Sequence, residues 1–499
     1  MAEQQSVSAV VVLAAGGGTR MKSQTSKLLH EVAGRSMLSY AVHAAQALEP
    51  EHLVVVVGHQ RDQVLAHLAD IAPHVSTAVQ DQQLGTGHAV QCGLTDIGDI
   101  TGEVVVTYGD VPMLTGDTLL ELVAAHRDNG AQVTVLTANI SDPYGYGRIV
   151  RDGDQVARIV EEKDASPDER SITEINSGIY VFDASTLHHG LAHLSTSNAQ
   201  GERYLTDVIR IARDNGDYVG AFTIDDLWQT EGVNDRVQLA RINAEMNRRI
   251  LEKWMRDGVT IIDPATTWIH ESVDLAPDVT LLPGTQLEGA TSVASGATIG
   301  PDTTLRDVEV GAFATVTRTH GSLAVIGAHA SVGPFAYLRP GTELGEKGKI
   351  GTFVETKNAR IGAGSKVPHL TYCGDAEIGE GVNVGAGTIF ANYDGTNKWP
   401  THLGDHVFIG SNTVLVAPVD VGDGGFVAAG STIVEDVPAG GLAVARGRQH
   451  TAEGWVGRKR PGSKAATAAA DPAPVSARVA EAHAKLDRLN SEPKAGDWK

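Results

Sequence analysis

Residues 326–350 read IGAHASVGPFAYLRPGTELGEKGKI. Its aliphatic residues Ile326, Val332, Leu338, Leu344 and Ile350 are each six positions apart. A period of six is neither that of an α-helix nor that of an ordinary strand pair, whereas a parallel β-helix with three flat sides places one hexapeptide on each side. The stretch therefore predicts a β-helix in which the aliphatic side chains point into the prism.

The same spacing recurs before and after this stretch. Gly often follows the aliphatic residue, and a small residue recurs a few places later, as in IGAGSK and VGAGTI. Hexapeptide β-helices of this kind are left-handed, an exception to the usual right-handed crossover rule. We expect a left-handed parallel β-helix domain over 259–457, with further aliphatic runs at Leu275, Leu281, Leu287, Val293, Ile299 and Leu305, at Leu403, Ile409, Leu415, Val421, Val427 and Ile433, and at the pairs Ile361/Val367 and Ile378/Val384.

The N-terminal segment 1–233 has a different pattern, in which short apolar runs alternate with helical stretches. Continuously apolar runs are typical of strands that are buried on both faces of a sheet. Strands that alternate with helices predict an α/β domain with a mainly parallel, doubly wound, Rossmann-like sheet, and ligands bind at the carboxyl ends of such strands. The expected strands are Ala9–Leu13, Leu53–Val57, Val104–Thr107 and Val133–Thr137, and the expected helices include Met37–Leu48 and Leu119–Asn129.

Two further segments complete the predicted organisation. Residues 234–257 contain neither Gly nor Pro and space their apolar residues helically, so 234–258 predicts a long connecting helix that ends at Gly258. The segment 458–499 is rich in Ala and Pro and lacks the six-residue period, which predicts a disordered or weakly helical tail.

Composition narrows the class of protein. The chain has 499 residues, too many for one ordinary core, and a formal net charge of −21, which argues against nucleic acid as a partner. The two cysteines, Cys92 and Cys373, lie far apart in sequence, so a disulfide framework is not expected and a reducing compartment fits. The N-terminus has no basic leader and the chain has no apolar run long enough to span a membrane, so we expect a cytoplasmic protein.

A candidate phosphate site follows the first predicted strand. Residues 13–27 read LAAGGGTRMKSQTSK. Glycines at 16, 17 and 18 let backbone N–H groups approach phosphates closely, and Arg20 and Lys27 can neutralise a triphosphate. A glycine triplet alone would equally fit a tight turn, and its spacing is neither that of a P-loop nor that of a dinucleotide fingerprint.

The complete string is more specific, because it resembles the LAAGxGTRM…PK signature of sugar-nucleotide pyrophosphorylases. One departure is Ser26, where that family usually has proline, and we expect this change to loosen the position of Lys27 slightly. The strings QDQQLGTGHAV, YGDVP, GYGRIV, VEEKDA, INSGIY and EGVND agree in order and spacing. The resemblance implies catalytic roles for Arg20 and Lys27, a Mg²⁺ site at Asp110 and Asn234, and nucleotide-sugar contacts from Leu13, Ala14, Ala15, Gly16, Lys27, Gln80, Gly85, Thr86, Tyr108, Gly109, Asp110, Gly147, Glu161, Asn176 and Asn234.

A second candidate site interrupts the six-residue period. The interrupted stretch 339–379 contains Arg339, Lys357, His369 and Tyr372. Acetyl transfer to an amine needs a base that acts near neutral pH, which suits histidine, and two basic residues can hold a sugar phosphate. The default interpretation of one histidine among 19 is a surface or core residue, so the surrounding string has to decide.

HLTYCGDAEIG followed by NVGAGTIFANYDGTNK resembles the bifunctional bacterial enzymes that are both glucosamine-1-phosphate N-acetyltransferases and N-acetylglucosamine-1-phosphate uridyltransferases. The match covers both halves of the chain, to about Trp455. It implies that His369 is the general base, that the β-helices assemble as homotrimers with an acetyl-transfer site between neighbours, and that acetyl-CoA and UTP are co-substrates. It assigns the amino-sugar phosphate to Arg339, Lys357, Tyr372 and Asn383, and acetyl-CoA to Ala386, Asn392, Tyr393, Ser411, Ala429 and Arg446.

Three hypotheses follow for the function. The first is a bifunctional enzyme that acetylates glucosamine-1-phosphate and then transfers a uridyl group from UTP, giving UDP-N-acetylglucosamine for cell-wall polymers. The second is a pyrophosphorylase with a single activity, whose β-helix is a trimerising scaffold. The third is a non-catalytic protein that binds sugar nucleotides. Cys373, beside Tyr372, is expected to be a packed residue, because direct acetyl transfer needs no acyl-enzyme.

Overall fold

A computed structural model describes residues 6–470 and residue 484 of the chain. The chain separates into two compact units, Met1–Val444 and Ala445–Lys499. The finer division at 233, 258 and 457 stays a prediction, and part of the predicted tail lies outside the described residues.

The N-terminal part of the first unit is built on one mixed β-sheet. The strands of this sheet are β1 (Ala9–Ala14), β4 (His52–Val57), β5 (Ser76–Val79), β6 (Glu103–Tyr108), β7 (Val133–Asn139), β8 (Gly147–Asp152), β9 (Gln155–Val160), β10 (Glu174–Asp183) and β11 (Val219–Ile224). Along its main path the strand order is β11-β7-β10-β6-β1-β4-β5, and β8 and β9 form a hairpin that pairs with β10. Strand β10 is antiparallel to both β6 and β7, whereas the other pairs along the path are parallel. The prediction of a mainly parallel sheet is confirmed, with β10 as the exception.

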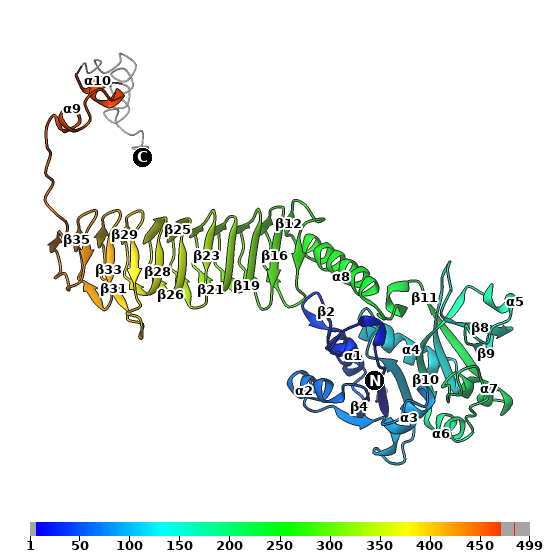
Figure 1. Cartoon of the computed structure of the whole chain (residues 1–499). Coiled ribbons are helices and arrows are strands. Elements are labelled where there is room, and N and C mark those ends of the chain that lie inside the picture. The colour runs from blue at the N-terminus through cyan, green and yellow to red at the C-terminus, as the bar shows by residue number, and fades with distance from the viewer. Residues whose placement is uncertain (1–5, 471–483, 485–499) are drawn as a thin grey trace, which may run out of the picture. The chain divides into compact units, whose positions relative to one another are not determined.

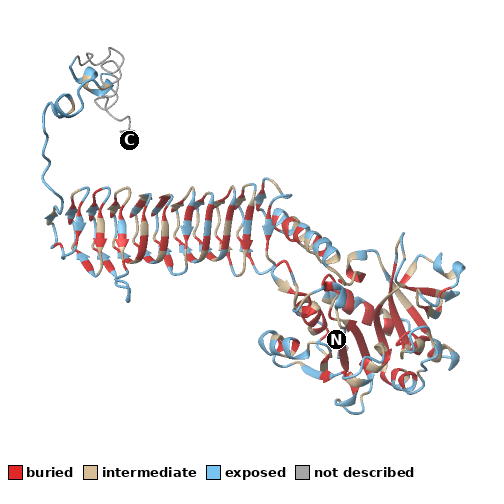
Figure 2. Ribbon diagram, viewed as in Figure 1, coloured by how far each residue is buried: buried red, intermediate tan, exposed pale blue. Residues whose placement is uncertain are grey.

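Helices cover both faces of this sheet (Figure 1). Residues of β1 alternate between two buried clusters: Val10 and Val12 belong to one, Val11 and Leu13 to the other. The strands β1, β4, β6 and β7 are accordingly buried over most of their length (Figure 2), as the continuous apolar runs predicted. The helices of this domain are α1 (Met37–Gln46), α2 (Arg61–Ile71), α3 (Thr86–Thr95), α4 (Gly116–Asp128), α5 (Pro167–Arg170), α6 (Ala184–Ala192) and α7 (Asp207–Asp214), with short 3₁₀ turns η1 (Thr19–Met21), η2 (Lys27–Leu29) and η3 (Leu227–Thr230) and a small hairpin of β2 (Glu31–Val32) and β3 (Arg35–Ser36).

The long helix α8 spans Arg236–Arg256, within the predicted 234–258. Asp235 caps its N-terminus, because its carboxylate accepts hydrogen bonds from the N–H groups of Val237 and Gln238 at 2.9 Å. The Asn247 amide then ties α8 to the first coil of the β-helix: its Nδ2 donates to the Thr267 carbonyl at 2.9 Å, and its Oδ1 accepts from the Ile269 N–H at 3.0 Å.

The C-terminal part of the first unit is a left-handed parallel β-helix with three faces, as predicted. One face consists of β12 (Thr260–Ile261), β15 (Thr280–Leu281), β18 (Thr298–Ile299), β20 (Thr315–Val316), β22 (Ser331–Val332), β25 (Lys349–Thr352), β27 (Lys366–His369), β29 (Asn383–Val384), β32 (Phe408–Ile409), β35 (Phe426–Val427) and β37 (Leu442–Ala443). The second consists of β13 (Trp268–Ile269), β16 (Thr285–Glu288), β23 (Ala336–Leu338), β30 (Ile389–Ala391), β33 (Val414–Val416) and β36 (Thr432–Ile433), and the third of β14 (Asp274–Leu275), β17 (Ser292–Val293), β24 (Thr342–Leu344), β31 (Thr401–Leu403) and β34 (Val419–Val421). The longer strands β19 (Thr303–Val310), β21 (Thr319–Ile326), β26 (Glu355–Ile361) and β28 (Tyr372–Ile378) run across the corner between these two faces.

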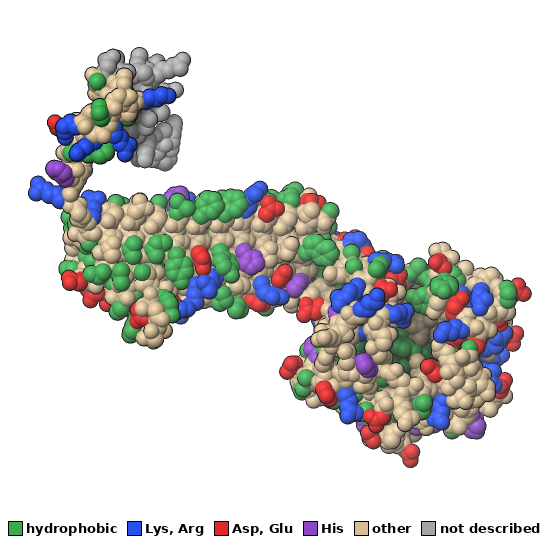
Figure 3. Space-filling view, viewed as in Figure 1, with side chains coloured by type: hydrophobic (Ala, Val, Ile, Leu, Met, Phe, Trp, Pro, Cys, Tyr) green, Lys and Arg blue, Asp and Glu red, His purple; other side chains and the backbone are tan. Residues whose placement is uncertain are grey.

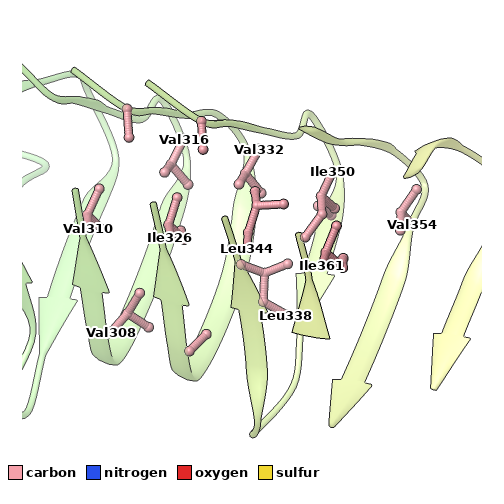
Figure 4. Packing of buried hydrophobic residues seen from close by; sticks show 14 of the residues in the cluster. Val308, Val310, Val316, Ile326, Val332, Leu338, Leu344, Ile350, Val354 and Ile361 are labelled. Atoms are coloured by element: carbon pink, nitrogen blue, oxygen red, sulfur yellow. The ribbon is translucent and has the colours of Figure 1, made fainter. Parts of the chain in front are cut away.

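The aliphatic residues that defined the period stack inside the prism (Figure 4). Leu338 and Ile350 are completely buried in one continuous apolar cluster. The small residue of each hexapeptide is often a buried Thr whose hydroxyl donates to a backbone carbonyl three residues earlier, as from Thr342 to Arg339 and from Thr388 to Gly385, both at 2.7 Å. These bonds satisfy polar groups at the corners that would otherwise be buried without a partner.

The coils depart from the ideal length near the predicted second site. Leu281 pairs with Ile299, eighteen residues on, as three hexapeptides require. Ile350 pairs with Val367, which makes that coil one residue shorter than three hexapeptides. Val384 pairs with Ile409, which makes that coil seven residues longer, because an extra loop follows β30. Several corners near this region also use non-glycine residues in the left-handed conformation, including Phe335, Phe353 and Leu370.

The described part of the second unit is small. It contains the short helices α9 (Trp455–Lys459) and α10 (Lys464–Ala470), so the described start of the predicted tail is partly helical. No helix of residues 6–470 is long and apolar enough to cross a membrane.

Candidate functional sites

The loop after β1 brings Arg20 and Lys27 close to the carboxyl edge of the sheet. Gly18 adopts a left-handed conformation with φ of +55°, and a Cβ there would lie 2.8 Å from the Lys27 Cβ. Glycine is therefore required where the loop folds back against Lys27. Arg20 lies in η1 and Lys27 opens η2, so each cation has a defined local structure.

The predicted metal ligands come together although they are far apart in sequence. The Val233 N–H donates to the Asp110 carbonyl at 2.9 Å, which brings Asn234 beside the end of β6. The Lys27 ammonium forms an ion pair with the Asp110 carboxylate, and the Arg20 guanidinium donates to the Asn234 Oδ1 at 2.8 Å. Arg20 and Lys27 thus contact the two residues that the sequence predicts as metal ligands, Asn234 and Asp110.

Two adjoining cavities of about 270 and 640 Å³ open at this edge of the sheet, and they share Thr86, Tyr108, Asp110 and Glu202. All but one of the predicted nucleotide-sugar residues line one or both of them: Leu13, Ala14, Ala15, Gly16, Lys27, Gln80, Gly85, Thr86, Tyr108, Asp110, Gly147, Glu161, Asn176 and Asn234. The exception is Gly109, which follows Tyr108 and donates its N–H to the Leu13 carbonyl at 3.0 Å.

The Gln80 side chain, which lines the smaller cavity, is held by a hydrogen bond. The Gln80 side chain is buried, and its Nε2 donates to the Gly85 carbonyl at 3.1 Å. The Thr86 hydroxyl accepts a hydrogen bond from the Leu205 N–H at 3.0 Å, which joins the start of α3 to the segment before α7. Gln80 and Thr86, two of the predicted nucleotide-sugar contacts, are therefore held by bonds to other segments.

The larger cavity is lined by Gly147, Glu161 and Asn176 of the predicted nucleotide-sugar contacts. Burial raises the pKa of the Glu161 carboxyl, and the neighbouring Asp164 and Asp207 act in the same direction. Glycine is needed at Gly178, because a Cβ there would lie 2.6 Å from the Tyr108 ring. Burial also raises the pKa of the Tyr108 phenol, which keeps its O–H as a hydrogen-bond donor.

Sequence reasoning missed an ion pair at the rim of this cavity. The buried Arg148 guanidinium donates to the Glu162 carboxylate at 2.7 Å and also bonds the Tyr146 carbonyl. The Gly145 N–H donates to the same carboxylate at 3.3 Å, so the pair stabilises the turn that precedes Gly147. The strings GYGRIV and VEEKDA contain both partners, but nothing in them says that the two charges meet.

In the β-helix, His369 heads a column of equivalent corner residues. Thr352 pairs with His369 in the register of β25 and β27, and the registers of the following strands continue this column. Three of the predicted acetyl-CoA residues follow His369 along it, one from each later coil: Ala386, Ser411 and Ala429. The His369 ring is exposed and makes no hydrogen bond with the described residues.

A polar cluster lies on the adjoining face. Lys357 forms an ion pair with Asp375 at 3.5 Å, and the Asn392 amide bonds both Asp375 and the Tyr372 hydroxyl, the latter at 3.3 Å. Burial acts to raise the pKa of Asp375, but hydrogen bonds from Asn358 and Asn392 outweigh it and the pKa is lowered. The cluster joins the predicted sugar-phosphate residues Lys357 and Tyr372 to a predicted acetyl-CoA residue.

Arg339 belongs to the same surface, where its guanidinium forms an ion pair with Glu355 at 2.8 Å. Lys398, which sequence reasoning missed, adds another cation: its interaction with the nearby Lys357 lowers the pKa of the Lys398 ammonium. Three basic residues that crowd together are suited to a phosphate group. The NYDGTNK string contained Lys398, but only its contact with Lys357 marks it as part of the site.

The extra loop after β30 carries Tyr393, another of the predicted acetyl-CoA contacts. The Tyr393 hydroxyl donates to the Gly395 carbonyl at 2.7 Å, and the Trp399 indole donates to Asp394 at 2.7 Å, so the loop is internally bonded. Asn383 opens β29 and pairs with Lys366, on the face that leads to Ala386. Arg446 lies in the second unit, near its start.

The chain is similar to known proteins over most of its length. A family model for the MobA-like NTP transferase domain matches residues 10–173. The chain is 57% identical to the bifunctional protein GlmU of Corynebacterium efficiens, over 94% of this chain and 98% of that protein. It is 58% identical to the bifunctional protein GlmU of Mycolicibacterium vanbaalenii, over 92% of this chain and 94% of that protein. The chain belongs to the GlmU family.

Membership of the GlmU family confirms the prediction of a bifunctional enzyme. The similarity extends across the nucleotidyltransferase-like domain and the β-helix, because the GlmU protein of Streptomyces avermitilis is also 56% identical over 92% of this chain and 96% of its own length. The two sites described above therefore lie in the two halves of a GlmU protein.

Proposed function

We propose that the cavities at the edge of the N-terminal sheet bind UTP and N-acetylglucosamine-1-phosphate, and that the His369 column binds acetyl-CoA and glucosamine-1-phosphate. As a GlmU protein, the chain is an enzyme with uridyltransferase and acetyltransferase activities.

Asp110 and Asn234 are the proposed Mg²⁺ ligands. Their donors are a carboxylate and an amide oxygen, which are ligands that Mg²⁺ accepts, and Mg²⁺ commonly takes only one or two protein ligands beside substrate phosphates and water. This fits residues 6–470 and 484, which contain no cluster of three or more His, Cys, Asp or Glu side chains placed to hold a metal. Bound there, Mg²⁺ would neutralise phosphate charge.

Uridyl transfer needs no protein nucleophile. A phosphate oxygen of the sugar phosphate attacks the α-phosphorus of UTP, and pyrophosphate leaves. Arg20 and Lys27, which contact the proposed ligands Asn234 and Asp110, then lie where charge builds up on the leaving pyrophosphate. The contact between these two cations and the two oxygen ligands is the observation that carries this half of the proposal.

Acetyl transfer is assigned to His369 as the general base. Its ring removes a proton from the sugar amine, the amine attacks the thioester carbon of acetyl-CoA, and the CoA thiolate leaves. Arg339, Lys357, Tyr372 and Asn383 hold the sugar phosphate, with Lys398 as an additional cation. Ala386, Asn392, Tyr393, Ser411, Ala429 and Arg446 are the proposed contacts of acetyl-CoA. The acetyl-transfer half of the proposal rests on the column that runs from His369 through Ala386, Ser411 and Ala429.

The two reactions are proposed as consecutive steps, acetylation first, that yield UDP-N-acetylglucosamine. Incubation of the full chain with glucosamine-1-phosphate, acetyl-CoA, UTP and Mg²⁺ is expected to release CoA and then pyrophosphate. Omission of acetyl-CoA is expected to suppress pyrophosphate release until N-acetylglucosamine-1-phosphate is supplied. Pyrophosphate release at the full rate from the unacetylated sugar would contradict this order.

A cytoplasmic location is also proposed for the protein. UTP and acetyl-CoA as substrates, together with the free thiols of Cys92 and Cys373, favour this location.

A homotrimer is the proposed assembly. Hydrophobic side chains gather on the outside of the β-helix (Figure 3), and they include Phe335, Phe353 and Leu370, each more than half exposed. Apolar surface of this kind favours protein–protein contact, and flat-sided prisms suit threefold packing.

Sedimentation analysis tests the trimer directly. We expect the full chain to sediment with three times the 52.4 kDa mass of one chain. A stable monomer at micromolar concentration that still acetylates at the full rate would contradict both the trimer and an acetyl-transfer site shared between subunits.

A further inference from the structure

The loop that delivers Lys27 is held by the side chain of a neighbouring helix. Gln63, in the first turn of α2, accepts a hydrogen bond at its Oε1 from the Ser26 N–H at 2.9 Å, and its Nε2 donates to the Gln24 carbonyl at 3.0 Å. The backbone N–H can only donate and the carbonyl can only accept, so the orientation of the Gln63 amide is unambiguous. Gln60 donates a second hydrogen bond to the Gln24 carbonyl, also at 3.0 Å.

Helix α2, which carries Gln63, is packed against the core of the domain. Val64 is completely buried, and it belongs to the same apolar cluster as Leu28, the residue after Lys27. The segment that carries Lys27 is therefore held by apolar packing after the lysine and by the Gln63 amide before it.

The contact exists because residue 26 has an N–H group. Ser26 is 4% exposed and has φ of −51° and ψ of 138°, a backbone conformation that proline also adopts. Proline would preset this φ through its ring but would have no N–H to donate. In this chain the hydrogen bond from the Ser26 N–H to Gln63 restrains the backbone at residue 26, as the ring of a proline would.

We propose that Gln63 is a positioning residue for uridyl transfer, which fixes Ser26 and so sets the place of the Lys27 ammonium. Lys27 is 11% exposed at its side chain and pairs with Asp110, so a small shift of its backbone moves the cation relative to the site. This proposal rests on the proposed role of Lys27 in uridyl transfer. On this proposal, Ser26 does not leave Lys27 more loosely placed, because the Gln63 amide holds its N–H group.

Four variants test the proposal: Gln63→Leu, Ser26→Pro, the double variant, and Gln46→Leu as a matched control. Gln46 also bonds a neighbouring segment through its amide, at His74, but lies outside the Lys27 loop. Gln63→Leu is expected to lower kcat/KM for uridyl transfer about tenfold, because a misplaced charge loses catalytic effect steeply with distance. Acetyl transfer is expected to stay unchanged in all four variants.

The double variant is the decisive measurement. Proline needs no partner for an N–H group, so Ser26→Pro in the Gln63→Leu background is expected to restore kcat/KM to within about threefold of wild type. A merely structural role of Gln63 in α2 would leave the double variant as impaired as Gln63→Leu. Gln63→Leu at the wild-type rate, or a double variant that is not rescued, would overturn the proposal.

A Lys27→Ala variant separates this proposal from the proposed function. If Lys27→Ala keeps full uridyl transfer, the role of Lys27 is wrong. If Lys27→Ala loses uridyl transfer while Gln63→Leu does not, only the positioning role of Gln63 is wrong. Thermal melting of each variant distinguishes loss of activity from loss of fold.

Discussion

Asp110→Asn is expected to abolish uridyl transfer while acetyl transfer continues at the wild-type rate. The substitution keeps the size of the side chain but removes the negative charge that pairs with Lys27 and that is proposed to bind Mg²⁺. Charge neutralisation by a metal contributes several kcal/mol to a transition state that carries phosphate charge, so the expected loss is at least about a thousandfold. The loss should appear in kcat, because the missing interaction acts on the leaving pyrophosphate.

The measurement is pyrophosphate release from UTP and N-acetylglucosamine-1-phosphate, followed over a range of Mg²⁺ concentrations. Asp117→Asn is the matched control, since Asp117 is exposed in the first turn of α4 and lies outside the two cavities. A protein that only binds sugar nucleotides would release no pyrophosphate even as wild type. Uridyl transfer within a few fold of wild type in Asp110→Asn would rule out the proposed metal site.

His369→Ala is expected to lose acetyl transfer and to keep uridyl transfer, the opposite of Asp110→Asn. Acetyl transfer should fall by about 10²–10⁴-fold, the usual contribution of a general base, because no other side chain then takes the proton from the amine. Uridyl transfer to supplied N-acetylglucosamine-1-phosphate should be unchanged. In the complete assay, the variant should therefore stop before the first product forms and resume when that product is added.

CoA release from acetyl-CoA and glucosamine-1-phosphate is the readout for this variant. His406→Ala serves as the control, because His406 is also an exposed corner residue of the β-helix but follows β31, outside the His369 column. If His369→Ala released CoA at the wild-type rate, the histidine would be a surface residue. If the wild-type chain released no CoA at all, the β-helix would be a scaffold for assembly only.

Local patterns predicted most of the fold. The six-residue period placed Leu338, Leu344 and Ile350 inside the β-helix, because one side chain per hexapeptide must fill the prism whatever lies around it. Continuous apolar runs likewise predicted that β1 and β4 belong to a sheet covered on both faces. The direction of β10 was missed, since a buried strand has the same apolar composition whether its neighbours run parallel or antiparallel to it.

The candidate sites were predicted less evenly. Motif strings named Asp110 and Asn234 as partners, and the structure brings them together through the bond from the Val233 N–H to the Asp110 carbonyl. The same strings contained Glu162 and Lys398 without any sign of their role. A charged residue in a loop is by default solvated, and only the partner that tertiary structure brings to it gives it a function.

The sequence by itself determined the repeat, four strands of the sheet and the resemblance to a family, because periodicity and motif spacing are properties of neighbouring positions along the chain. Only the tertiary structure decided which groups meet across it: Lys27 with Asp110, Lys357 with Asp375 and Lys398, and Ser26 with Gln63. Hydrogen bonds and ion pairs depend on distances of about 3 Å between atoms that can be far apart in sequence. For that reason Ser26 appears as a missing proline in the sequence and as a hydrogen-bond donor in the folded protein.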